Sequence, residues 1–217
     1  MKLFRAFIEN LYLSENNTEF EVATLNGREY VNNLLGLSFT LPSEWHIIKL
    51  EKFKQVYCQQ KLQQPFEQYK KELYDQFNNP FLICTKYNPD TKDHDGIITP
   101  IINFTVEAKT GDLNNITLQE YAEKLAYQCD AEYPMLKNFK ILNRGEIFTQ
   151  SYHNFILYNT EYLFEHPDLV NGIMVELNVL NIELEDFFLD FSMTHCKAQN
   201  EIETEVFNNF VKSIHIY

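Results

Sequence analysis

The sequence has 217 residues, of which 45% are hydrophobic and 15% aromatic, and it carries a net charge of −13 at pH 7. A chain of this length can bury a core of its own without cross-links, so we expect a globular protein with one main domain. Only 18 basic residues stand against 31 acidic ones. Because binding to a phosphate backbone depends on clustered Lys and Arg, this balance argues against nucleic acid as a partner.

Cysteine usage indicates a reducing compartment. The four cysteines are widely separated and form no C-x-x-C pair or zinc-finger spacing: Cys58, Cys84, Cys129 and Cys196. Free, buried thiols are therefore expected. Glu9 and Asn10 interrupt the apolar start of the chain, so we expect no signal peptide. No stretch approaches the ~20 apolar residues of a membrane-spanning helix, and the expected location is cytoplasmic.

In chain order, residues 1–33 are expected to form an N-terminal extension, either a helix and a hairpin that close one end of the sheet or an amphipathic arm that binds a partner, with turn residues in SENNTEF and TLNGREY. A single α+β domain over residues 34–217 follows. Its first strand spans 37–41 and ends at Pro42, because proline cannot donate to a sheet ladder. The following HIIKL could resume as its partner strand. Residues 51–80 look like an inserted helical segment that carries several lysines.

The middle of the chain predicts two strands and a helix. Alternation of apolar residues places the strands at 81–87 and 100–108. Thr117 and Glu120 have the spacing of a capping box, so a helix should run from 117 to 132. Its apolar residues recur at helical spacing and should pack on the sheet.

The last third predicts more strands and a closing helix. Strands are expected at 145–149 and 155–164, and two adjoining segments of period-two alternation over 172–194 predict a long antiparallel hairpin in the middle of the sheet. A helix beginning at Asn200 should turn Ile202 and later apolar residues inward. The order of elements indicates an α+β protein with a largely antiparallel sheet flanked by helices.

Two segments resemble PsbP-like domains. G-L-S-F-T-L-P-S-E-W, which starts at Gly36, is similar to their opening, and F-N-N-F-V-K-S-I, residues 207–214, is similar to their closing helix. The resemblance spans about 34–214. It implies an α/β/α sandwich that works by binding, as in photosystem subunits, DcrB-type lipoproteins and Eag-type chaperones of secreted effectors. The chain has no lipidation signal and is longer than the compact chaperones, and the family implies no catalytic residues.

No motif for catalysis, cofactor or metal is present in the sequence. The six glycines are too far apart for a phosphate-binding loop, and neither G-x-S-x-G nor H-E-x-x-H occurs. His195 and Cys196 are adjacent, but neighbours on a strand point to opposite faces, which argues against a catalytic dyad. We therefore predict no catalytic residues, no cofactor and no metal site.

The acidic residues are concentrated late in the chain. The span 160–205 holds eleven carboxylates and one basic residue, Lys197. If Leu177 faces Leu189 in the hairpin, then Glu176 and Asp190 lie directly opposite on its outward face, where like charges destabilise a sheet unless they are compensated. Three explanations remain open. The surface is solvated or neutralised by lysines from 49–71, it docks a basic protein, or it forms a metal or acid/base site.

The expected function is that of a non-catalytic protein-binding module, adaptor or chaperone-like, which binds its partner through the sheet or the acidic C-terminal half. The candidate binding residues are four carboxylates: Glu176, Glu183, Asp186 and Asp190. One alternative is an immunity protein that neutralises a basic toxin, for which such an acidic field would speed the encounter. Another is a carboxylate-based or metal-dependent enzyme.

Overall fold

The computed structural model describes residues 23–33, 35–48, 82–88, 99–132, 137–165 and 171–217. The chain forms two compact units, Met1–Ser43 with Asn208–Tyr217, and Glu44–Phe207. The predicted insertion at 51–80 and most of the predicted extension lie outside the described residues. The prediction of one domain over 34–217 stays a prediction.

The first unit is built on a small antiparallel sheet in the order β1-β2-β3-β12. Its strands are Ala23–Asn26, Glu29–Asn32, Leu37–Thr40 and His215–Ile216. The predicted hairpin at TLNGREY is confirmed, with Gly27 at φ 64° in its turn. Phe39 stacks on Tyr30 with ring centres 4.6 Å apart and meets the edge of Phe210 at 5.3 Å. These aromatic contacts form the core of the unit.

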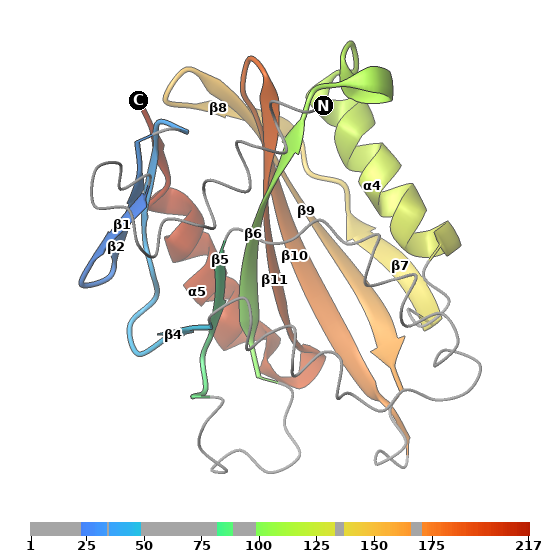
Figure 1. Cartoon of the computed structure of the whole chain (residues 1–217). Coiled ribbons are helices and arrows are strands. Elements are labelled where there is room, and N and C mark those ends of the chain that lie inside the picture. The colour runs from blue at the N-terminus through green and yellow to red at the C-terminus, as the bar shows by residue number, and fades with distance from the viewer. Residues whose placement is uncertain (1–22, 34, 49–81, 89–98, 133–136, 166–170) are drawn as a thin grey trace. The chain divides into compact units, whose positions relative to one another are not determined.

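The second unit contains a larger antiparallel sheet in the order β4-β5-β6-β11-β10-β9-β7, and β8 also pairs with β9 (Figure 1). Its strands are His46–Ile47, Leu82–Thr85, Ile101–Ala108, Lys137–Asn143, Ile147–Gln150, His153–Phe164, Ile173–Glu183 and Phe187–Cys196, numbered β4 to β11. The predicted hairpin is confirmed as β10 and β11, at the centre of this sheet. Alternating side chains of its central strands bury both faces.

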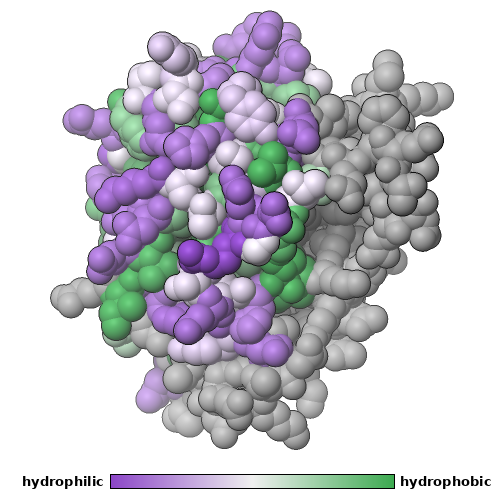
Figure 2. Space-filling view, turned by 90° about the vertical axis from the view of Figure 1, so that its left-hand side faces the viewer, coloured by the Kyte–Doolittle hydropathy of each residue, from purple (hydrophilic) through white to green (hydrophobic). Residues whose placement is uncertain are grey.

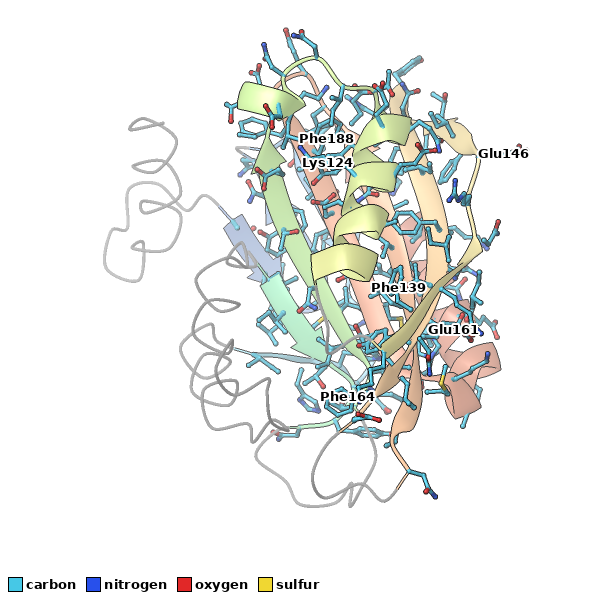
Figure 3. The ribbon with its side chains drawn as sticks, turned by 90° about the vertical axis from the view of Figure 1, so that its right-hand side faces the viewer. Lys124, Phe139, Glu146, Glu161, Phe164 and Phe188 are labelled. Carbon is cyan, nitrogen blue, oxygen red and sulfur yellow. The ribbon has the colours of Figure 1, made fainter. Side chains whose placement is uncertain are left out.

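Two helices complete the α+β sandwich: α4, Leu118–Glu132, and α5, Asn200–Lys212. The predicted capping box of α4 is confirmed, since Glu120 accepts the Thr117 N–H at 2.7 Å and Thr117 Oγ1 accepts the Glu120 N–H at 3.2 Å. Figure 3 shows α4 lying along one face of the large sheet. Tyr121 stacks on Phe188 there, with ring centres 3.9 Å apart. Short 3₁₀ turns occur at Gly111–Leu113 and Lys197–Gln199.

Four expectations need correction, and one concerns the register of the hairpin. Leu189 pairs with Ile182 and not with Leu177. The Leu184 N–H donates to the Phe187 carbonyl at 2.9 Å, so two residues, Glu185 and Asp186, make the turn. The difference from the expected register is an odd number of residues, and an odd shift exchanges the faces that the two strands share.

The other corrections concern two strands of the large sheet and the buried side of α5. The strand β7 was not predicted, because irregular pairing with β9 breaks its period-two pattern. The strand from HIIKL pairs with β5 rather than with the strand before it. In α5, Ile202 is 66% exposed, whereas Glu203 is 1% exposed and binds Lys86. The buried side of α5 therefore includes Glu203, which pairs with the partly exposed Lys86, and does not include Ile202.

Candidate functional site

The four predicted carboxylates do not form one acidic face. Glu176 pairs with His195 on one face of the sheet, and Asp190 pairs with Asn181 on the other. Glu176 is buried and Asp190 is partly covered. The carboxylate pair on which the enzyme alternative depended is therefore not formed. In the part of the chain that the structure describes, no three His, Cys, Asp or Glu side chains are arranged to hold a metal ion.

Glu183 and Asp186 also have different surroundings, because the first is paired and the second is exposed. Glu183 forms an ion pair of 2.9 Å with Lys109, and the Asn154 amide donates to its other oxygen at 3.5 Å. Asp186 lies exposed in the turn of the hairpin. Of the four residues, only Asp186 is openly available to a basic partner.

Lysines of β7 and lysines that directly follow other strands neutralise part of the acidic span. Glu161 binds Lys197 and Lys140, and the hydrogen bond from Lys197 lowers its pKa. Other pairs join Lys137 to Glu165 and Lys86 to Glu203. The lysines of 49–71, which were expected in this role, lie outside the described residues. The acidic charge of 160–205 is thus partly compensated inside the fold.

His195 and Cys196 do not form a dyad. Both ring nitrogens of His195 are occupied, since Nδ1 donates to the Cys196 carbonyl at 3.1 Å and Nε2 accepts from the Asn178 amide at 2.9 Å. Asn159 donates in turn to the Asn178 side chain. This buried row of polar groups crosses three strands and satisfies its own hydrogen bonds, which is what a structural network requires.

Asp190 is held by two hydrogen bonds on the α4 side of the sheet. The Tyr121 hydroxyl donates to Oδ2 and the Asn181 amide donates to Oδ1, both at 2.6 Å. Burial raises the pKa of Asp190 to about 7, although both hydrogen bonds lower it. Burial, together with the negative charge of Asp190, also raises the pKa of Tyr121, so the tyrosine remains the donor.

A groove of about 700 Å³ opens between α4 and β7. Its walls come from one face of α4 and from the inner side of β7, and its floor comes from β9. The lining residues are Gln119, Ala122, Glu123, Ala126, Phe139, Lys140, Ile141, Arg144, Gly145, Ile156 and Tyr158. We call it the α4–β7 groove. Its volume lies within the range of ligand-binding sites, and periodicity could not predict it because β7 itself was not predicted.

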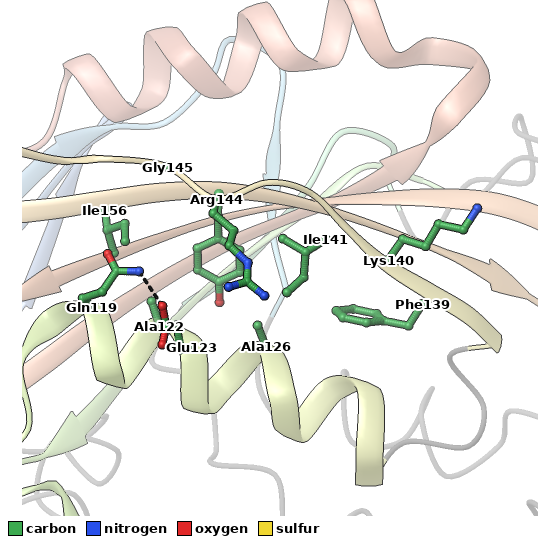
Figure 4. A pocket seen from close by; sticks show the side chains of 11 residues that line it. Gln119, Ala122, Glu123, Ala126, Phe139, Lys140, Ile141, Arg144, Gly145 and Ile156 are labelled. Carbon is green, nitrogen blue, oxygen red and sulfur yellow. Dashed lines mark hydrogen bonds between the residues drawn. The ribbon is translucent and has the colours of Figure 1, made fainter.

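Irregular backbone directs side chains into this groove. The register between β7 and β9 shifts twice, and Asn138 lies at φ 56° inside the first shift. Such bulges turn a strand and redirect its side chains. In Figure 4 the Arg144 side chain points down between β7 and α4, whereas Lys140 points away. Gly145 permits this path, because a Cβ there would lie 1.6 Å from the Leu157 carbonyl oxygen.

The hairpin formed by β8 and β9, together with the end of β7, exposes large hydrophobic side chains next to the groove. They are Leu142, Ile147, Phe148 and Tyr152, with exposed fractions of 47%, 45%, 38% and 101%. We call these four residues the hairpin surface. The turn residues Ser151 and Tyr152 both have positive φ, 51° and 66°. A side chain as bulky as tyrosine rarely adopts this conformation.

Another face of the molecule is more hydrophilic than the hairpin surface. In Figure 2 hydrophilic side chains predominate over the described part of that face, and hydrophobic ones show in small, separate groups. Scattered surface hydrophobics of this kind are ordinary and need no functional explanation. The described residues contain no helix long and apolar enough to cross a bilayer.

Comparison with known proteins identifies the fold and nothing finer. No protein-family model matches the sequence, and no curated protein matches it. Among solved structures, the cyanobacterial PsbP (CyanoP) from Synechocystis sp. PCC 6803 is similar over 91% of this chain and 100% of its own, with 11% identity and a TM-score of 0.53.

Two further structures show weaker similarity. LpqN from Mycobacterium tuberculosis, described as involved in cell envelope biogenesis, covers 83% of this chain and 82% of its own at 12% identity and a TM-score of 0.46. PA94 from Pseudomonas aeruginosa, a protein of unknown function, covers 58% and 75% at 14% identity and a TM-score of 0.43. The fold of this chain, a largely antiparallel α+β sandwich, is PsbP-like.

Proposed function

We propose that the chain is a non-catalytic protein-binding module, adaptor or chaperone-like in its action, and that it engages its partner through the hairpin surface. The observation that carries the proposal is the exposure of Leu142, Ile147, Phe148 and Tyr152 within eleven residues of chain. Tyrosine is among the residues that contribute most to the binding energy of protein interfaces. Because neighbours on a strand point to opposite faces, Ile147 and Phe148 expose apolar surface on both sides of the hairpin, and large exposed apolar side chains often mark interfaces.

Backbone strain at the tip of the hairpin also supports binding through the hairpin surface. A two-residue turn with positive φ at both positions favours Asn-Gly, whereas this turn contains Ser151 and Tyr152. Each non-glycine residue in this conformation costs roughly 1–2 kcal/mol. Strain of this size tends to occur where function requires the side chain. Tyr152, fully exposed, makes no packing contribution that would explain its presence.

The edge of the sheet adds a second means of contact. Along β9, the strands β7 and β8 follow one another as a single interrupted edge. No described strand pairs with the outer side of β8. An open edge can accept an extended segment of another protein through backbone hydrogen bonds. The hairpin surface would supply the side-chain contacts of such a complex.

A cytoplasmic location and a DcrB- or Eag-type relationship belong to the same proposal. Cys84 is a buried thiol outside any disulfide, which fits a reducing compartment. The role of an immunity protein remains a prediction with less support from the geometry, because Asp186 is the only openly exposed member of its four carboxylates.

Affinity purification from the native host tests the proposal. Wild type would be compared with the double variant Ile147→Ser/Tyr152→Ser, and Ile202→Ser serves as the matched control because Ile202 is 66% exposed and lies on α5. We expect a protein partner that is retained by wild type and by the control and is lost from the double variant. Recovery of the same partner by all three proteins, or of no partner by wild type, would contradict the proposal.

A further inference from the structure

We propose that the α4–β7 groove binds the C-terminal end of a partner polypeptide, with its terminal carboxylate on Arg144 and its last apolar side chain on the groove floor. This inference rests on the proposed function in taking the partner to be a protein. It concerns a different surface from the hairpin surface, so the two can fail separately.

The floor and walls of the groove suit an apolar side chain. Ala122 and Ala126 present only methyl groups from α4, and Ile156 and Tyr158 come from β9; all four are at least nine-tenths buried. They continue into the core cluster under α4. Small residues on one wall leave space beside a rigid apolar surface, and this arrangement favours insertion of a side chain from outside.

The groove is large enough to hold the end of a polypeptide chain. Its volume is about 700 Å³, and one hydrophobic residue fills roughly 150–200 Å³ at the packing density of proteins. Three or four residues of an extended segment would therefore fit between α4 and β7. Such a segment would run alongside β7, whose residues Phe139, Lys140 and Ile141 line one side.

Charge identifies which part of the polypeptide would bind. The Arg144 side chain points into the groove (Figure 4) and makes no hydrogen bond or ion pair with the described residues. Lys86, Lys109, Lys137, Lys140 and Lys197, by contrast, all pair with glutamates. A guanidinium beside an apolar surface matches a planar carboxylate through two parallel hydrogen bonds.

The wall formed by α4 supplies a hydrogen-bond acceptor, the Glu123 carboxylate, which disfavours a simple fatty-acid-like anion. Gln119 donates to Glu123 at 2.9 Å, which holds the Glu123 carboxylate at the groove (Figure 4). A carboxylate can only accept, so it repels a purely anionic ligand but receives an N–H group. A terminal peptide residue carries both groups, the carboxylate for Arg144 and a backbone N–H for Glu123.

Fluorescence polarisation of the purified full chain tests this assignment. The probes are fluorescein-labelled hexapeptide mixtures of random sequence that end in Leu, Ile, Val or Phe, each made with a free C-terminal carboxylate and with a C-terminal amide. We expect the free acids to bind about tenfold more tightly than the amides, because the amide loses the charged hydrogen bonds with Arg144. Equal binding of acid and amide, or no binding of either, would overturn the proposal.

Variants locate the site. Arg144 is exposed and has no partner to lose among the described residues, so Arg144→Gln should weaken the free-acid peptides by about tenfold and leave the amides unchanged. Lys137→Gln is the control on the same strand and should have no effect, since Lys137 does not line the groove and pairs with Glu165. An equal loss in both variants would overturn the assignment to Arg144.

Two competition arms distinguish the source of the carboxylate. Unlabelled acid peptide should displace the probe, whereas octanoate and free leucine at the same concentration should not. Full displacement by octanoate or by leucine would replace the peptide with a small carboxylate and overturn the proposal. The double variant Ile147→Ser/Tyr152→Ser should bind the peptides normally, so failure of the hairpin surface and failure of the groove give different results.

Discussion

Asp190 should make the stability of this protein fall as the pH rises through neutrality, and Asp190→Asn should remove that dependence. Burial raises the pKa of Asp190 in the folded chain to about 7, from an ordinary value of 3.8. Between those two values the folded protein binds one proton more than the unfolded chain. The stabilising contribution of this group is therefore complete below pH 4 and is lost as the pH rises through 7.

The magnitude follows from the shift. About three pKa units correspond to about 4 kcal/mol, of which about 3 kcal/mol falls between pH 5 and pH 8. The variant should keep its fold, because the Asn amide oxygen can still accept from the Tyr121 hydroxyl that binds Oδ2 at 2.6 Å. Its amide group can also donate to the Asn181 oxygen, which has no partner among the described residues, once the Asn181 amide rotates.

Equilibrium unfolding in guanidinium chloride, followed by circular dichroism at pH 5, 6, 7 and 8, measures the effect. The quantity of interest is the free energy of unfolding of Asp190→Asn minus that of wild type, which should grow by about 3 kcal/mol over this range. Asp186→Asn, at the exposed turn of the same hairpin, is the control. A difference that stays constant with pH, or one that the control reproduces, would refute the argument that burial dominates at Asp190.

Three other changes have expected outcomes. Tyr152→Gly should raise the free energy of unfolding by about 1 kcal/mol, because glycine adopts a positive φ without strain. Recovery of the partner should fall in the same variant. A variant that loses both stability and binding would show that the tyrosine supports the fold. Gly145→Ala should destabilise by about 2–4 kcal/mol in the same unfolding assay, since its Cβ would overlap the Leu157 carbonyl oxygen; an unchanged midpoint would mean that the backbone yields easily. Thr117→Ala should cost about 1 kcal/mol by removing the cap of α4, and a loss no larger than the error of the measurement would contradict a stabilising role for the capping box.

Local patterns predicted most of the elements. The capping box at Thr117, the turn at Gly27 and the alternation over 172–194 each depend on residues close together in the chain, so sequence alone identifies them. The α+β class and the PsbP-like fold followed from the order of these elements and from the resemblance of short segments at both ends.

The candidate sites depended on features that periodicity does not encode. The hydrophobic pattern admitted more than one register for the central hairpin, and the two-residue turn at Glu185 and Asp186 selected one that separates Glu176 from Asp190. The strand β7 was missed because its bulges break the alternation by which strands are recognised. Both sites were consequently absent from the expectations drawn from sequence.

By itself, the sequence determined most of the segments that form strands and helices, with β7 as an exception, because those choices are made mainly by neighbours along the chain. Only the tertiary structure decided that Arg144 points into a groove, that Tyr152 is held exposed at positive φ, and that Glu203 rather than Ile202 is buried. Each of these outcomes depends on contacts or backbone geometry set by pairing with distant strands. Such pairing is selected by the energy of the whole fold rather than by local preference.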